Sequence, residues 1–318
     1  MDLRGPRRYE GSCCPPSLNR PHQRLNPLRT SLFLSKAEDI IPTKARRLRG
    51  FLLITGVIAL AVALVWFGYC LGRPAKDGHI PDFARLPYEP FSREAAVAIA
   101  LREWRLFDDQ VDDITPGQVP FVNLESSERS DGLWQRVGEY WWLGLDSDNQ
   151  FRSLTGKHDQ HGNVFSKQRD ELYAWSAVFV SYVMRIAGAG SRFPYSESHS
   201  DYINEASKAS LGLVPRRGVL AQRLELYTPQ PGDLVCFGRN ENRGLRFEDL
   251  PSSHFPAHCD IVVDVRPGKI SVVGGNVDDA VTLKHVPVTS KGRLADPSGN
   301  VLDRRYPWCV VIQVLYDR

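Results

Sequence analysis

The sequence predicts an α+β fold in which one transmembrane helix precedes a domain of helices followed by a mostly antiparallel sheet. Three observations predict it. An uncharged apolar segment precedes the body of the chain, the first half of the body has apolar residues at helical spacing, and the second half has short apolar runs between turn residues. The 318 residues are 42% hydrophobic and 24% charged, an ordinary globular composition that excludes a fibrous repeat.

The N-terminal residues 1–49 are predicted to form a basic, disordered cytoplasmic tail. They carry eleven Lys and Arg residues, four Asp and Glu residues, and six prolines. The net charge of the whole chain is only +3, which is too small to indicate a nucleic-acid partner. We therefore expect a protein that binds no nucleic acid.

Residues 50–72 are predicted to be a transmembrane signal anchor. A helix of this length spans roughly 34 Å, enough for the core of a bilayer. Basic residues gather just before it, so the positive-inside rule places the N-terminus in the cytoplasm and the C-terminal domain outside, in a periplasmic or other extracytoplasmic space. The expected localisation is the inner (cytoplasmic) membrane, crossed once. A cleavable signal peptide is the alternative, but no small-residue cleavage site closes the run.

Residues 73–91 contain four prolines and predict a stiff linker, and residues 92–318 are long enough for one core. Helical spacing predicts four helices, at 92–106, 132–144, 173–187 and 200–210. Alternating runs predict five strands, at 233–238, 259–265, 269–274, 280–286 and 308–315. Helices followed by hairpin-connected strands are typical of an α+β domain.

The third predicted helix carries a candidate nucleophile. Ser176 follows Trp175 in the first turn, where free backbone N–H groups and the helix dipole stabilise a developing anion. The alternative is that Ser176 only caps the helix, because serine is common at helix starts.

A predicted hairpin supplies a candidate base. By alternation Cys259 faces the core, whereas His258 and Asp260 face the other way. The Pro267-Gly268 turn then brings Asn276, or the residue after it, opposite His258. An amide at that position can hydrogen-bond to the imidazole and fix its tautomer. An exposed histidine without such a role is the alternative.

These segments resemble the CHAP and NlpC-type papain-like hydrolases. The run YAWSAVFVSYVMRIAGAG resembles their nucleophile helix, PGDLV at 231–235 resembles their Pro-Gly-Asp strand, and Gly274-Gly275-Asn276 resembles the end of the strand that follows the catalytic histidine. The resemblance implies a papain-like fold with Ser176 as nucleophile, His258 as general base and Asn276 as orienting group. The chain departs from that pattern, because Ser176 stands where these hydrolases have cysteine.

The chain resembles more closely an uncharacterised bacterial domain family placed in this superfamily. The shared elements are EYWWLGL, TGKHDQHG, the WSA helix, and SESHSDYI, which contains His199. This resemblance implies that Trp175, His199 and Asp260 line the cleft. Capping of the following helix is the alternative for His199.

The resemblance implies a membrane-anchored cell-envelope hydrolase that cleaves amide bonds of peptidoglycan through a Ser-His-Asn arrangement, with peptidoglycan or an envelope peptide as partner. The alternative is an inactive papain-like domain that binds envelope peptide, glycan or a protein. An acyl or peptidyl transferase with the same residues is a third reading.

No cofactor or metal is expected. His158 and His161 lie in a Gly-flanked loop without further ligands nearby. The apolar surroundings of Cys236, Cys259 and Cys309 favour buried small hydrophobes, although one disulfide among them is possible.

Overall fold

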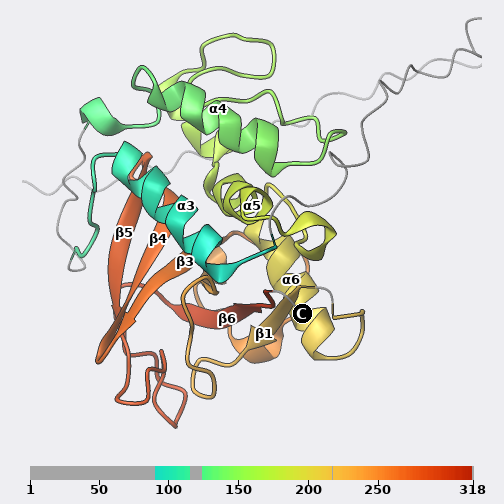
Figure 1. Ribbon diagram of the computed structural model, residues 1–318, viewed down its shortest axis with the longest axis vertical. Helices are drawn as coiled ribbons and strands as arrows, with labels where there is room; N and C mark the ends of the chain where they lie inside the picture. The colour runs from blue at the N-terminus through green and yellow to red at the C-terminus, as the bar shows by residue number, and fades with distance from the viewer. Residues whose placement is uncertain (1–89, 115–123, 217, 317–318) are drawn as a thin grey trace, which may run out of the picture. The chain divides into compact units, whose positions relative to one another are not determined.

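The computed structural model describes residues 90–114, 124–216 and 218–316, all within one unit, Ile80–Arg318 (Figure 1). Its helices are α3 Arg93–Leu106, α4 Leu133–Gly144, α5 Ser176–Ile186 and α6 His199–Ser210. The strands are β1 Val219–Gln222, β2 Leu234–Gly238, β3 Ala257–Arg266, β4 Lys269–Val277, β5 Ala280–Pro287 and β6 Trp308–Val314. The described chain is therefore an α+β domain with helices first and strands after.

The predicted fold class needs correction on the transmembrane helix. Within the described ranges, no helix is long and apolar enough to cross a membrane. The longest of them, α3, has 14 residues and spans about 21 Å, less than a bilayer core. The tail 1–49, the predicted span 50–72 and nearly all of the linker 73–91 lie outside the described residues. The structure supports an α+β domain with an antiparallel sheet and includes no membrane-spanning helix among the residues it describes.

The six strands form one antiparallel sheet in the order β1-β6-β2-β3-β4-β5. The β3–β4 hairpin pairs Ile261 with Val273, and its printed pairing ends there, before it reaches His258 and Asn276. A bulge interrupts the β4–β5 pairing after Gly274, and Asn276 there has a φ of 55°. Such bulges change the direction of a side chain at the end of a strand.

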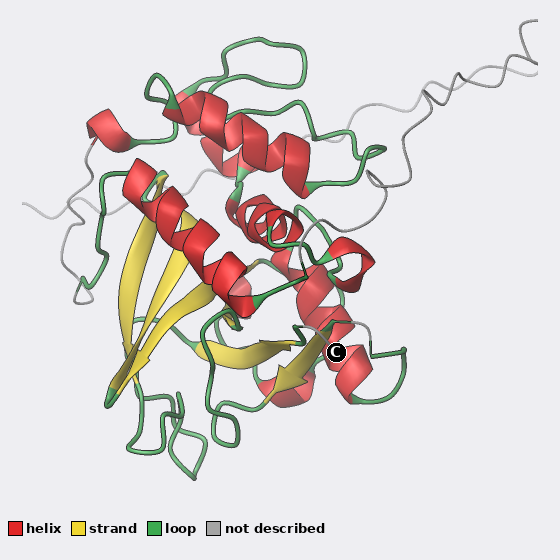
Figure 2. Ribbon diagram, viewed as in Figure 1, coloured by secondary structure: helices red, strands yellow, loops and turns green. Residues whose placement is uncertain are grey.

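Both faces of the sheet are covered. Helices α3, α5 and α6 lie on one face, and α4 packs against α5 (Figures 1 and 2). Cys259, Ile261 and Val263 of β3 join the helix-side core, whereas Val262 joins a second core on the opposite face. That second core includes Leu294, from the segment between β5 and β6. By the same alternation, the side chains of His258 and Asp260 lie on the second face and are enclosed there.

Two glycines let β4 approach the start of α5 and the middle of β3. A Cβ at Gly275 would lie 2.6 Å from atoms of Phe179 and 2.8 Å from the ring of Trp175. A Cβ at Gly274 would lie 1.9 Å from a carboxylate oxygen of Asp260. The Gly-Gly pair therefore holds helix α5 against the sheet and leaves room for a buried carboxylate beside it.

Candidate functional site

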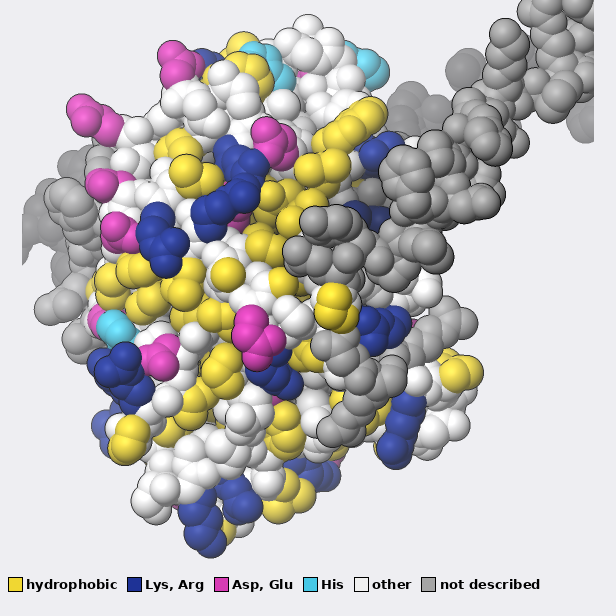
Figure 3. Space-filling view, viewed as in Figure 1, with side chains coloured by type: hydrophobic (Ala, Val, Ile, Leu, Met, Phe, Trp, Pro, Cys, Tyr) yellow, Lys and Arg dark blue, Asp and Glu magenta, His cyan; other side chains and the backbone are white. Residues whose placement is uncertain are grey.

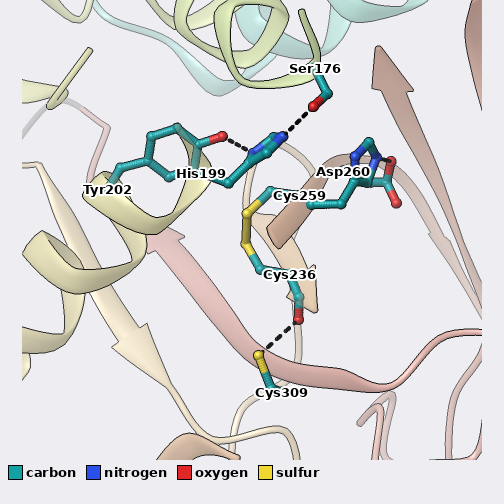
Figure 4. The surroundings of a disulfide bond; sticks show 8 residues. Ser176, His199, Tyr202, Cys236, Cys259, Asp260 and Cys309 are labelled. Carbon is teal, nitrogen blue, oxygen red and sulfur yellow. Dashed lines mark hydrogen bonds and ion pairs between the residues drawn. A yellow bond between two sulfur atoms is a disulfide. The ribbon is translucent and has the colours of Figure 1, made fainter. Parts of the chain in front are cut away.

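Ser176 is the first residue of α5, and its hydroxyl contacts an imidazole. Its Oγ lies 2.7 Å from Nε2 of His199, the first residue of α6 (Figure 4). The first hydrogen bond of α5 runs from Phe179 N to Trp175 O. The backbone N–H groups of Ser176 and Ala177 therefore have no acceptor inside the helix and form its positive end.

His199 is held from its other side by Tyr202, one turn further along α6. The Tyr202 hydroxyl makes a hydrogen bond with Nδ1 of His199 (Figure 4). Burial lowers the pKa of His199 well below its usual value, and the nearby His258 lowers it further. Burial also raises the pKa of the Tyr202 phenol, so both groups are neutral at pH 7.

The tautomer of His199 decides the direction of these two hydrogen bonds. A neutral imidazole has one N–H donor and one acceptor nitrogen. If Nδ1–H donates to Tyr202, Nε2 accepts the proton of the Ser176 hydroxyl. If Tyr202 donates to Nδ1, the Nε2–H group donates to Ser176 instead. Only the first arrangement activates the hydroxyl.

A second group of buried polar side chains adjoins this pair. Nε2 of His258 lies 3.0 Å from Oδ1 of Asp260, and Lys284 Nζ lies 2.9 and 3.0 Å from the two Asp260 oxygens. Burial alone would raise the pKa of Asp260, but the Lys284 ammonium and His258 hold it well below its usual value. Burial lowers the pKa of His258 despite the neighbouring carboxylate. The rings of His199 and His258 are 5.2 Å apart, so the two groups adjoin.

The structure pairs the predicted catalytic residues differently from the sequence analysis. Ser176 bonds to His199 rather than to His258, and the His258 ring bonds to Asp260 rather than to Asn276. Asn276 and His258 nevertheless line the same cleft. His199 does not cap α6, since the N-cap residue is Ser198 and the His199 ring points to Ser176.

Trp175 and Asp260, expected to line the cleft, are 1% and 0% exposed. The indole N–H of Trp175 donates to Glu128, and its ring stacks near Phe107. Both residues support the site from inside the core because their polar atoms are used on buried partners.

A cleft of about 330 Å³ opens beside the second group. His258, Asn276 and Lys284 line it, together with Arg239 and other residues of the surrounding loops. Ser176 and His199 are each 4% exposed and are not among its lining residues. Of the two imidazoles, the described cleft is therefore lined by His258, although this residue is itself only 3% exposed.

Cys236 and Cys259 form a disulfide between opposite positions of β2 and β3 (Figure 4). The sequence left one disulfide among the three cysteines open, and the structure pairs these two. Cys309 is a free buried cysteine whose Sγ lies 3.4 Å from the carbonyl oxygen of Cys236. Burial raises the pKa of the Cys309 thiol to about 12, so it stays protonated. The disulfide ties Cys259 of β3 to β2, and His258 is the residue directly before Cys259.

Among residues 90–114, 124–216 and 218–316, no group of three or more His, Cys, Asp or Glu side chains has the arrangement of a metal site. The ring of His158 packs edge-on against Trp134, and its Nδ1 lies 3.3 Å from Thr155 Oγ1.

The sequence analysis missed Tyr202 and Lys284. The spacing of His199 and Tyr202 puts both on one face of a helix, and this signal was available. Lys284 is a charged residue in an otherwise largely apolar strand. The sequence shows this charge but does not show which residue pairs with it. Pairing Lys284 with Asp260 requires the strand order β3-β4-β5, which the hairpin turns suggest but do not fix.

A comparison with protein families places this site within a known family. The family described as "Uncharacterized protein conserved in bacteria (DUF2272)" matches residues 128–314, more than half of the chain, so the chain belongs to it. The matched range includes every residue of the two polar groups. Searches of the curated proteins and of the solved structures gave no match.

Proposed function

We propose that this protein is a serine-dependent amide hydrolase of the bacterial cell envelope, with Ser176 as nucleophile and His199 as general base. The observation that carries the proposal is the 2.7 Å contact between Ser176 Oγ and His199 Nε2 at the start of α5. A hydroxyl needs a base within hydrogen-bond reach because it does not ionise near neutral pH.

In the proposed reaction Ser176 Oγ attacks the amide carbonyl, and its proton passes to Nε2 of His199. The carbonyl oxygen becomes an oxyanion, which the free N–H groups at the start of α5 stabilise. His199 then gives the proton to the leaving amine, and the C–N bond breaks to leave an acyl ester on Ser176. Water, activated by His199, hydrolyses the ester and restores the hydroxyl.

Tyr202 and the His258–Asp260 pair have supporting roles in this scheme. Tyr202 accepts the Nδ1–H bond and fixes the ring but, being neutral, supplies no charge to the imidazolium. Burial is the largest influence on the pKa of His199 and lowers it, and His258 lowers it further, while the negative charge of Asp260 acts in the opposite direction. Within the pair, only Asp260 favours the imidazolium that forms during attack.

The substrate class and the compartment rest on two further arguments. The resemblance to papain-like NlpC and CHAP hydrolases supports peptide amide bonds of peptidoglycan as substrate. The Cys236–Cys259 disulfide supports an oxidising, extracytoplasmic compartment, because such bonds are rare in the cytosol.

The test is incubation of the full chain with purified peptidoglycan, followed by mass spectrometry for new peptide termini. We expect Ser176→Ala and His199→Gln each to lower the cleavage rate by about 10⁴-fold. The matched control is Ser210→Ala at the opposite end of α6 from His199, where the Ser210 hydroxyl donates to the Ala221 carbonyl. Fluorophosphonate labelling of Ser176 should disappear in His199→Gln. Unchanged cleavage in Ser176→Ala would refute the proposal.

One observation favours a second candidate, a non-catalytic domain that binds envelope peptide. Ser176 is 4% exposed, and a proton donated by Tyr202 to Nδ1 would leave Ser176 in a static hydrogen bond. In that case peptide fragments bind equally to the wild type and to Ser176→Ala, and no new termini form.

A further inference from the structure

The cleft beside His258 has walls of different charge. On the face drawn in Figure 3, basic side chains lie among acidic and apolar ones, so neither sign of charge dominates that face. Any preference for a charged ligand must therefore come from a small group of residues. Within the cleft, Arg239 and Arg243 flank the short helix Asn240–Asn242 that follows β2. Asp278 follows β4, at the turn into β5.

The order of the strands separates these charges. His258 begins β3, which lies between β2 and β4 in the sheet. The arginines therefore lie on the β2 side of His258 and Asp278 on the β4–β5 side. An anionic ligand group is attracted to the β2 side and repelled from the other.

The cationic residues of the cleft differ in whether they are already paired. Lys284 binds both oxygens of Asp260, and Arg305 Nε lies 3.0 Å from Asp303. Within the described part of the chain, the guanidinium groups of Arg239 and Arg243 take part in none of the hydrogen bonds or ion pairs, and both residues are exposed. These two arginines are therefore available to a ligand.

The position of Arg239 links this pair to the chemistry. Its positive charge is one of the influences that lower the pKa of both His199 and His258, after the larger effect of burial. Arg239 lines the same cleft as His258, whose ring lies 5.2 Å from the ring of His199. A ligand group held by Arg239 therefore lies in the cleft beside His258, one imidazole away from His199, which does not itself line the cleft.

We propose that Arg239 and Arg243 bind a carboxylate of the substrate, so that the protein acts on acidic peptides held in the cleft beside His258. This inference rests on the proposed function for the bond that is cut, but the binding step does not depend on cleavage. A guanidinium donates two parallel N–H bonds to the two oxygens of one carboxylate. A glutamine in the ligand has only one acceptor oxygen and no negative charge, so it cannot accept this pair of bonds in the same way.

Binding is measured by calorimetry on the full-length Ser176→Ala variant, which cannot turn over its ligand by the proposed route. The probes are an N-acetylated Ala-Glu-Ala-Glu amide and the same peptide with glutamine in place of glutamate. We expect the glutamate peptide to bind at least about tenfold more tightly. Adding Arg239→Ala and Arg243→Ala should remove that preference. Adding Arg304→Ala, an exposed arginine outside this cleft, should leave it unchanged.

The outcomes separate the two proposals. The inference is supported if binding depends on charge and this dependence is lost only in the Arg239 and Arg243 variants. Absence of cleavage by the wild type would refute the proposed hydrolase but not this inference. Equal affinity for the two peptides, no binding of the glutamate peptide, or an equal loss in Arg304→Ala overturns the inference. Thermal denaturation of each variant checks that the fold is retained.

Discussion

Burial keeps His199 and His258 neutral in the folded protein, and this makes stability depend on pH. The pKa of each imidazole is lowered in the folded state, whereas in the unfolded chain it is about 6.5. Below pH 6.5 the unfolded chain therefore binds protons that the folded chain does not. We expect the free energy of unfolding to fall with decreasing pH, by up to about 1.4 kcal/mol per pH unit for each histidine. Thermal or urea denaturation between pH 7.5 and pH 5 measures this.

A variant isolates the contribution of one residue. His199→Gln keeps a polar side chain without a titrating proton, so its stability should vary less steeply with pH than that of the wild type. The control is His161→Gln, because His161 is exposed and lies in a loop. If the free energy of unfolding of His199→Gln varied with pH as steeply as that of the wild type, this would contradict a neutral, buried His199. The same burial predicts that cleavage by the wild type persists below pH 6.5, since the base stays unprotonated.

At the level of elements, hydrophobic periodicity was sufficient for most of the fold. The helices lie within a few residues of their predicted ranges, although α5 buries every residue from Ser176 to Met184 rather than one apolar stripe. The five longer strands follow from their short apolar runs. Strand β1 was missed, since its four residues are defined by pairing with β6 rather than by a pattern. The two-residue turn fixes the β3–β4 register only as far as Asp264 and Ser271, beyond which a bulge shifts it by one residue, and the sequence left both registers open.

The site was predicted only in part, for a physical reason. The sequence places Ser176 at a helix start and His258 at a strand start, because both positions depend on local pattern. The contact between Ser176 and His199 depends on how α6 packs beside α5, which no local pattern specifies. Alternation also gave the face of Asp260, but not the core that covers that face.

The contact of α5 with β4 gives a prediction at this scale. In Gly275→Ala, the new Cβ would lie 2.6 Å from Phe179, so α5 must shift or the strand must bend. We expect a loss of about 1–3 kcal/mol in stability and a larger relative loss of activity, because Ser176 lies at the shifted end of α5. The control is Gly244→Ala, where nothing lies within 4 Å of the new Cβ. Wild-type stability and activity in Gly275→Ala would show that the contact is not tight.

Across the whole domain, the sheet connects the two halves of the chain. Its helix side packs α3, α5 and α6, and its opposite side packs the segment between β5 and β6. The Cys236–Cys259 disulfide lies in the helix-side core, joins two central strands and adjoins His258. A change there therefore affects the core and the site together.

The Cys236–Cys259 disulfide is expected to stabilise the folded domain. It closes a loop with a sequence separation of 23, which corresponds to about 3 kcal/mol of stabilisation in the chain-entropy account. Reduction, or the double variant Cys236→Ala and Cys259→Ala, should lower the midpoint of thermal unfolding by roughly 6–12 °C. A reductant should shift Cys309→Ala as much as the wild type and leave the double variant unchanged, because Cys309 is free. Cleavage and labelling of Ser176 should fall in parallel, since β3 then loses its link to β2 beside His258. A reductant that leaves the wild-type midpoint and the Ser176 labelling unchanged would show that neither the core nor the site depends on this bond.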